Sequence, residues 1–239
     1  MDHIDVLVVG AGLSGVGAGA YLERECKWAD YAVFEARGAI GGTWDLFRYP
    51  GIRSDSDMFT LGYSFKPWNR ENSIADGDQI RDYIVETAQE YGVDKKIQFN
   101  TKVISADWST VDGHWLVTAE RVDTNERFQL SANFVFGCSG YYRYDHGYEP
   151  EFPGRDEFTG TVVHPQHWPE DLDYADKKVV VIGSGATAVT LIPSMAKTAA
   201  HVTMLQRSPA YIFSAPAQDP IAQALRRVLP ERINAPIIR

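Results

Sequence analysis

The sequence predicts an α/β protein in which two Rossmann-like strand–helix–strand units flank an inserted antiparallel β-meander. Two glycine-rich turns indicate the units, GAGLSG at residues 10–15 and GSGATA at residues 183–188, and each follows a short apolar, largely β-branched run. The meander is indicated by three strand-like runs between about residues 101 and 131, which turn residues separate.

The composition is that of a globular protein without a nucleic-acid partner. The chain has 239 residues, of which 44% are hydrophobic, and a net charge of -9, whereas nucleic-acid binding requires a basic face. Its 2 cysteines are too few for a disulfide framework. No apolar run reaches the roughly 18 residues of a membrane span, and the N-terminus lacks the basic region of a signal peptide. We therefore expect a cytoplasmic protein.

The first unit has the full pattern of a dinucleotide-binding fold. An apolar run at residues 4–9 enters the turn, small residues at 16–22 predict a tightly packed helix, and a strand at 31–35 ends in an acid. In this pattern the three glycines permit a tight turn, close approach of a pyrophosphate, and helix–strand packing, and the acid binds ribose hydroxyls. Because a carboxylate repels a 2′-phosphate, FAD or NAD is expected rather than NADP. The expected binding residues are Gly10, Gly12, Leu13, Ser14, Gly15 and Glu35. A chance glycine-rich turn and a surface acid are the alternatives.

The second unit repeats this pattern with two changes. A strand at 178–182 enters the turn, a helix is predicted to about residue 197, and a strand follows at 201–206. An alanine replaces the third glycine, and an arginine stands where the first unit has its acid. Since a cation can bind a 2′-phosphate, NADP(H) is expected here. The expected residues are Gly183, Ser184, Gly185, Ala186, Thr187 and Arg207. A surface charge is the alternative for the arginine.

Between the first turn and the meander lies an irregular segment, GGTWDLFRYPGIRSD at residues 41–55. Glycines, a proline and aromatics without periodicity indicate an ordered loop, and such a loop near a dinucleotide turn suits a ligand wall. A rigid surface loop is the alternative. A helix is predicted over residues 76–91, where apolar residues recur at helical spacing.

The meander is predicted from strands at 102–108, 115–120 and 128–130, and a further buried strand at 134–138 is expected to return to the first sheet. Cys138 is interpreted as a buried structural thiol.

The segment FTGTVVHPQHWP at residues 158–169 joins the two units and places two aromatics, a glycine and a histidine at fixed offsets. An ordinary loop with a buried Trp168 and a solvated His164 is the alternative. The tail at 221–239 mixes apolar residues with arginines. A helix that packs on further structure is favoured there over peripheral contact with a membrane or an acidic surface.

Together these segments resemble the Baeyer–Villiger-type flavin-dependent monooxygenases. The linker fits the family fingerprint, FxGxxxHxxxW followed by Pro or Asp, at every position, and residues 41–55 fit a second signature. The resemblance implies an FAD-binding domain at residues 1–150, a linker at 151–175 and an NADP-binding domain at 176–239 that is C-terminally incomplete. It also implies that Gly42, Thr43, Trp44 and Asp55 line the flavin. Asp55 and His164 are the expected catalytic residues, with His164 coupling linker and domain motion rather than donating a proton.

The resemblance further implies a reaction. NADPH reduces the flavin, reduced flavin forms a peroxyflavin with O2, and one oxygen atom is inserted into a ketone or transferred to sulfur. The expected substrate is a small-molecule ketone, thioether or thioamide. In the family, the arginine that steadies the peroxyflavin comes from sequence beyond this chain.

Two other function classes remain open. The first is a reductase that uses NADPH to reduce a flavin or a disulfide. A disulfide reductase needs a redox-active cysteine pair, and Cys26 and Cys138 do not form a CxxC motif. A non-catalytic nucleotide-binding fragment is the second.

Overall fold

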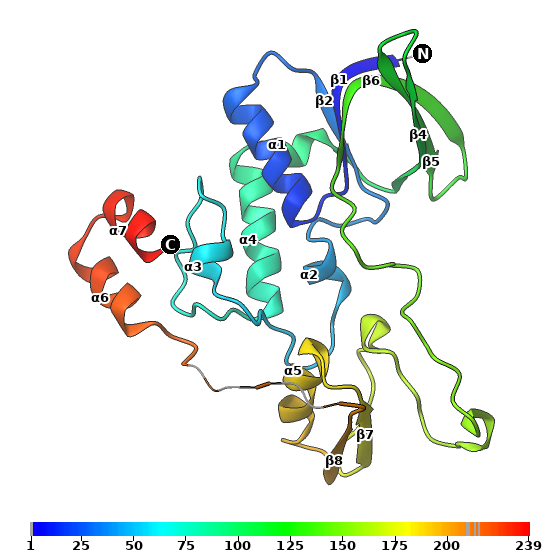
Figure 1. Ribbon diagram of the computed structural model, residues 1–239, viewed down its shortest axis with the longest axis vertical. Coiled ribbons are helices and arrows are strands. Elements are labelled where there is room, and N and C mark those ends of the chain that lie inside the picture. Colours follow the sequence, from blue (N-terminus) through cyan, green and yellow to red (C-terminus); the bar gives the residue numbers. More distant parts are fainter. Residues whose placement is uncertain (1, 209–210, 213, 215) are drawn as a thin grey trace. The chain divides into compact units, whose positions relative to one another are not determined.

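A computed structural model describes residues 2–208, 211–212, 214 and 216–239. The chain forms two compact units (Figure 1). The first contains the residues up to Leu46 and Ile80–Tyr142, and the second contains Phe47–Gln79 and Arg143–Arg239. The loop at residues 41–55 is therefore shared between the units, although the sequence assigns it to one domain.

The first unit is built on a six-stranded sheet with the strand order β3-β2-β1-β6-β5-β4. Its strands are β1 (Asp2–Val9), β2 (Tyr31–Phe34), β3 (Ile97–Gln98), β4 (Thr101–Ser109), β5 (His114–Arg121) and β6 (Arg127–Gly137). Strands β3, β2, β1 and β6 pair in parallel, and β6, β5 and β4 pair antiparallel. This arrangement confirms the mixed α/β fold and the meander.

Strand β6 joins the two halves of this sheet, so the prediction of two separate strands is wrong. Its first part, residues 127–132, pairs with β5, and pairing with β1 begins at residue 130 and continues through the second part to Gly137 (Figure 1). The second part is not buried as predicted, because Phe134 and Phe136 are 54% and 47% exposed. Cys138, directly after the strand, is only partly buried. The meander thus continues the main sheet rather than standing apart from it.

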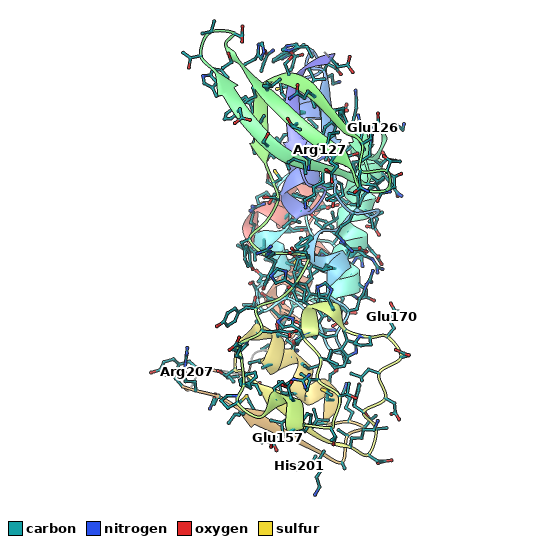
Figure 2. All side chains as sticks on the ribbon, turned by 90° about the vertical axis from the view of Figure 1, so that its right-hand side faces the viewer. Glu126, Arg127, Glu157, Glu170, His201 and Arg207 are labelled. Atoms are coloured by element: carbon teal, nitrogen blue, oxygen red, sulfur yellow. The ribbon has the colours of Figure 1, made fainter. Side chains whose placement is uncertain are left out.

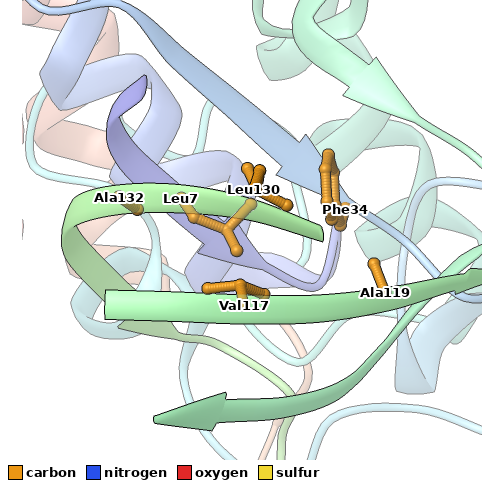
Figure 3. Packing of buried hydrophobic residues seen from close by; sticks show 6 residues of the cluster. All are labelled: Leu7, Phe34, Val117, Ala119, Leu130 and Ala132. Atoms are coloured by element: carbon orange, nitrogen blue, oxygen red, sulfur yellow. The ribbon is translucent and has the colours of Figure 1, made fainter. Parts of the chain in front are cut away.

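An apolar core lies between the curved strands of this sheet (Figure 3). It consists of Leu7, Phe34, Val117, Ala119, Leu130 and Ala132. Full burial of a side chain of the size of leucine or phenylalanine contributes about 1.5–3 kcal/mol, so this cluster ties the meander to the parallel half of the sheet.

Helix α1 (Leu13–Glu25) follows β1 and is lined with small residues, as predicted. A Cβ atom at Gly19 would lie 2.6 Å from Cγ1 of Val93, so this helix face admits no larger residue without a shift. Helix α4 (Gly77–Glu90) matches its prediction closely and is followed by the 3-10 turn η1 (Val93–Lys96). The loop at residues 41–55 contains one helical turn, α2 (Thr43–Leu46), which the sequence did not indicate.

The second unit contains a parallel two-stranded sheet of β7 (Lys178–Ile182) and β8 (His201–Leu205). Helix α5 (Ala186–Met195) connects these strands, which confirms the second strand–helix–strand unit. The remaining elements are α3 (Met58–Leu61), the 3-10 turns η2 (Arg155–Glu157) and η3 (Pro165–His167), α6 (Pro220–Val228) and α7 (Glu231–Ile238).

The C-terminal tail forms α6 and α7, which pack within the second unit. The Arg226 guanidinium donates hydrogen bonds to the carbonyl oxygens of Asn69 and Arg70 and lies 5.7 Å from the ring centroid of Phe59. This tail therefore packs on structure that is already in the chain, which differs from the expected packing on further structure. Across the part of the chain that is described, no helix is both long and apolar enough to cross a membrane.

Candidate functional site

The first glycine-rich turn is closed by the end of strand β6. Gly10 has a φ of +103°, which glycine adopts readily, and a Cβ atom there would lie 2.6 Å from the Cys138 carbonyl oxygen. A Cβ atom at Gly15 would lie 1.8 Å from the Gly10 carbonyl oxygen. Packing within the protein therefore requires both glycines.

Gly12 differs, because nothing in the surrounding structure requires a glycine there. Its φ of -80° and ψ of -168° are open to any residue, and an added Cβ atom would make only ordinary contact, with Gly42 Cα at 3.5 Å. Gly12 is the N-cap of α1, makes no side-chain cap, and precedes a first turn without an acidic residue.

A helix N-terminus of this kind attracts an anion through its backbone N–H groups and partial positive charge. Leu13 and Ser14 begin this turn, and Ser14 is exposed. In dinucleotide-binding turns of this pattern, the second glycine lets the backbone approach the pyrophosphate. The turn therefore fits the diphosphate of a dinucleotide.

Glu35 lies directly after β2, and its carboxylate is held against the turn. The residue is only 6% exposed. One carboxylate oxygen accepts a hydrogen bond from the Ala11 N–H at 2.7 Å, and the other accepts one from the Arg37 N–H at 2.8 Å. Each oxygen keeps acceptor capacity for a further donor. Glu35 is thus a fixed acceptor beside the turn, which fits a ribose hydroxyl.

Arg37 belongs to this site although the sequence patterns did not indicate it. Its guanidinium forms an ion pair of 2.6 Å with the buried Asp45 and donates to the Gly42 carbonyl oxygen at 3.3 Å. The Gly41 N–H donates to the Ala11 carbonyl oxygen at 3.1 Å. These contacts hold the start of the loop at residues 41–55 against the first glycine-rich turn. No local pattern in the sequence marks Arg37, because its partners Gly42 and Asp45 come close only through the turn of the intervening loop.

Thr43 and Trp44, two of the predicted flavin-lining residues, lie in α2 within this fastened stretch, and both are partly buried. Asp55, another predicted flavin-lining residue, lies in the second unit and is exposed. It accepts a hydrogen bond from the Ser56 hydroxyl at 3.0 Å. The neighbouring Asp57 caps α3 through the backbone N–H of Phe59 at 2.9 Å, so helix capping does not occupy Asp55.

The second glycine-rich turn repeats the first geometry. Gly183 has a φ of +129°, and its N–H donates to the Leu205 carbonyl oxygen at 2.8 Å. Gly185 is the N-cap of α5, with a φ of -76° and no described atom within 4 Å of an added Cβ. Ala186 and Thr187 begin α5. Neither backbone nor packing requires glycine at 185, which is the condition found at Gly12.

The polar groups around this second turn differ from those of the first. The Ser184 hydroxyl lies 3.5 Å from the Ser208 carbonyl oxygen. Arg207 follows β8 and is exposed (Figure 2). A cation thus follows the second strand here, where Glu35 follows the second strand of the first unit.

The linker histidine, His164, is held by its neighbours rather than freely solvated. Its Nδ1 accepts the Gln166 N–H at 3.2 Å and caps η3. The buried Gln166 donates from Nε2 to the Arg143 carbonyl oxygen at 2.5 Å. A Cβ atom at Gly147 would lie 2.1 Å from the His164 Cε1, so the ring packs on the backbone of residue 147. Because Nδ1 accepts, the proton of the neutral ring is on Nε2.

The two cysteines do not have the features of a redox pair. Both are free thiols, with Cys26 at the end of α1 and Cys138 after β6. Burial raises the pKa of the Cys138 thiol, which lowers the fraction of thiolate that redox chemistry requires. Within the described ranges, no group of three or more His, Cys, Asp and Glu side chains is arranged to hold a metal ion.

Comparison with known proteins shows the family of this chain. The family model described as flavin-binding monooxygenase-like matches residues 4–223. The chain belongs to this family. The FAD-containing monooxygenase EthA of Mycolicibacterium smegmatis is 58% identical over 233 residues, which cover 97% of this chain and 47% of the relative. The putative FAD-containing monooxygenase MymA of Mycobacterium tuberculosis is 56% identical over 97% of this chain and 48% of the relative.

A solved structure with a similar fold is also that of a monooxygenase. A structure described as oxidized steroid monooxygenase bound to NADP is similar with a TM-score of 0.81 and 32% identity, over 98% of this chain and 43% of that one. The family match and these relatives confirm the resemblance to flavin-dependent monooxygenases. The chain spans about half the length of the curated relatives it matches.

Proposed function

We propose that this chain supplies the FAD-binding and NADP(H)-binding units of a monooxygenase. The enzyme would insert one oxygen atom from O2 into a small-molecule ketone, or transfer it to the sulfur of a thioether or thioamide. The observation that carries the proposal is the pair of matched turns. In each, no contact with the described residues requires the second glycine, while the residues that follow the second strands carry opposite charge, Glu35 and Arg207.

The first turn is the proposed site of FAD. Backbone N–H groups at the start of α1 face the diphosphate, and Glu35 accepts from the ribose hydroxyls. Arg37 and Asp45 keep the loop at residues 41–45 beside this turn, which places Gly42, Thr43 and Trp44 in a fixed stretch of backbone.

The second turn is the proposed site of NADPH. The first turn of α5 faces the diphosphate, with Gly183, Ser184 and Gly185 forming the approach. Arg207 is free to reach a 2′-phosphate from its exposed position, and its guanidinium matches the geometry of phosphate oxygens.

Bound FAD would supply the oxygen-activating chemistry. The residues of this chain bind and orient. His164 is proposed as a positioning residue, because its ring caps η3 and packs on Gly147. Asp55 is proposed to face the reacting groups. Its carboxylate is not used for helix capping, because Asp57 caps α3 instead.

A cytoplasmic location remains part of the proposal, supported by the two free thiols. Peripheral membrane contact by α6 and α7 is a weaker expectation, since Arg226 is used within the unit.

Binding of both nucleotides tests the proposal directly. The purified chain is titrated with FAD, NADPH and NADH, and flavin absorbance and nucleotide fluorescence are followed. Binding of FAD and a preference for NADPH over NADH support it, and a colourless protein that binds neither nucleotide overturns it. A version extended to the length of the relatives is then assayed for NADPH oxidation that depends on a cyclic ketone or a thioether. Binding without such turnover would favour the non-catalytic alternative.

A further inference from the structure

We propose that the turn at residues 49–51 is a positioning element for the second nucleotide site. It supports helix α5, whose first turn is the proposed site of the NADPH diphosphate. The inference rests on the proposed function, and it assigns a role on the NADPH side to a stretch that the sequence places on the flavin side.

Gly51 lies directly against α5. Its φ is +80°, and a Cβ atom there would lie 2.6 Å from the Thr190 carbonyl oxygen and 2.8 Å from the Ser194 hydroxyl oxygen. A backbone carbonyl cannot move aside without bending the helix. Only glycine therefore allows the turn to approach the middle of α5 this closely.

Tyr49 extends the contact toward the start of the helix. Tyr49 and Thr190 are 6% and 7% exposed, and their hydroxyl oxygens lie 3.4 Å apart. The Thr190 hydroxyl also lies 3.1 Å from the carbonyl oxygens of Ala186 and Thr187. A continuous set of polar contacts thus runs from Tyr49 to the first turn of α5.

The turn is also held by residues 75–77, at and just before the start of α4. The Gly77 N–H donates to the Ile52 carbonyl oxygen at 2.9 Å, and the Ser54 N–H donates to the Ala75 carbonyl oxygen at 2.8 Å. The Ala75 N–H in turn donates to the Ser54 hydroxyl at 3.0 Å. Since these bonds fix residues 52–54, the turn is a rigid support rather than a loop that follows α5.

The two ends of the loop at residues 41–55 therefore support different glycine-rich turns. Its start is fastened to the first glycine-rich turn through Arg37, and residues 49–51 are fastened to α5. A change at residue 51 should consequently weaken NADPH binding and leave FAD binding intact.

Gly51→Ala tests this separation, with Gly154→Ala as the matched control. Gly154 has a φ of +77°, close to that of Gly51, but no described atom lies within 4 Å of an added Cβ. Both variants place an alanine at a similar positive φ, and only Gly51→Ala carries the clash with α5. We expect Gly51→Ala to weaken NADPH binding by at least about tenfold, since overpacking of this kind shifts equilibria on that order.

The measurements are the dissociation constants for NADPH and FAD and the hydrogen exchange of α5 amides. FAD affinity should stay at the wild-type value in both variants, and α5 exchange should rise only in Gly51→Ala. If Gly51→Ala does not fold, Tyr49→Phe replaces it, with an expected weakening of roughly two- to tenfold from loss of one hydroxyl contact. NADPH affinity and α5 exchange equal to wild type in the folded variant would overturn the inference. A wild-type chain that binds no NADPH would instead overturn the proposed function.

Discussion

Replacement of Gly12 by alanine should separate nucleotide binding from folding. The backbone at residue 12 is unstrained, and the nearest atom to the added methyl group lies 3.5 Å away. The folded protein therefore accommodates the methyl group, while the diphosphate of a dinucleotide would not reach the N–H groups at the start of α1.

Two opposing effects on stability nearly cancel. Alanine has less backbone freedom than glycine in the unfolded chain, which stabilises the folded protein by about 0.4–1 kcal/mol. Alanine at an N-cap is less favourable than glycine by roughly 0.5–1 kcal/mol. The free energy of unfolding should therefore change by less than about 0.5 kcal/mol. Loss of one charge-assisted hydrogen bond to phosphate, about 1.5–3 kcal/mol, weakens binding by about tenfold or more.

Urea denaturation of the nucleotide-free protein gives the first quantity, and FAD titration followed by flavin fluorescence gives the second. Gly15→Ala is the contrasting variant. Its methyl group would lie 1.8 Å from the Gly10 carbonyl oxygen, so it should destabilise by at least about 1–3 kcal/mol. Wild-type FAD affinity in Gly12→Ala would refute the assignment of the turn. Destabilisation of Gly12→Ala by more than about 2 kcal/mol would show that packing needs this glycine after all.

Three further changes test other parts of the site. Glu35→Gln leaves one buried backbone N–H without its acceptor, so urea denaturation should show a loss of about 1–3 kcal/mol, and an unchanged midpoint would contradict the buried geometry. Arg207→Ala should weaken NADPH binding by about tenfold or more and leave NADH binding unchanged; equal losses for both would exclude a 2′-phosphate contact. Gly147→Ala should displace the His164 ring, remove the acceptor of the Gln166 N–H and speed hydrogen exchange of that amide, whereas an unchanged exchange rate would show that the ring is not seated there.

The sequence predicts the two strand–helix–strand units well, because a glycine-rich turn determines where a strand ends and a helix begins. Strands β1, β2, β7 and β8 lie within a few residues of their predicted bounds. The continuity of β6 is not predictable in the same way. Ser131, Ala132 and Asn133 interrupt its apolar pattern, and pairing with β5 on one side and β1 on the other keeps the backbone extended there.

Contacts between distant side chains also escape sequence patterns. The Arg37–Asp45 ion pair depends on a turn in the intervening loop that brings two charges together, and single charged residues in loops carry no periodic signal. Asp55 and Asp57 are equivalent in composition, yet only the structure distinguishes the helix cap at Asp57 from the exposed carboxylate at Asp55. The division of the loop at residues 41–55 likewise follows from packing against α5, which no local pattern encodes.

The long strand β6 sets the order in which the nascent chain matures. Strand β1 pairs with β6, whose last residue is Gly137, and the Cys138 N–H donates to the Val9 carbonyl oxygen at 2.9 Å. The turn at the very start of the chain is therefore completed only after residue 138 has left the ribosome. Pairing across so many residues is slow compared with local folding, and until then β1 presents an open strand edge to other chains. Chaperone dependence or aggregation during synthesis should consequently respond to changes at the end of β6 more than to changes in the glycine-rich turn itself.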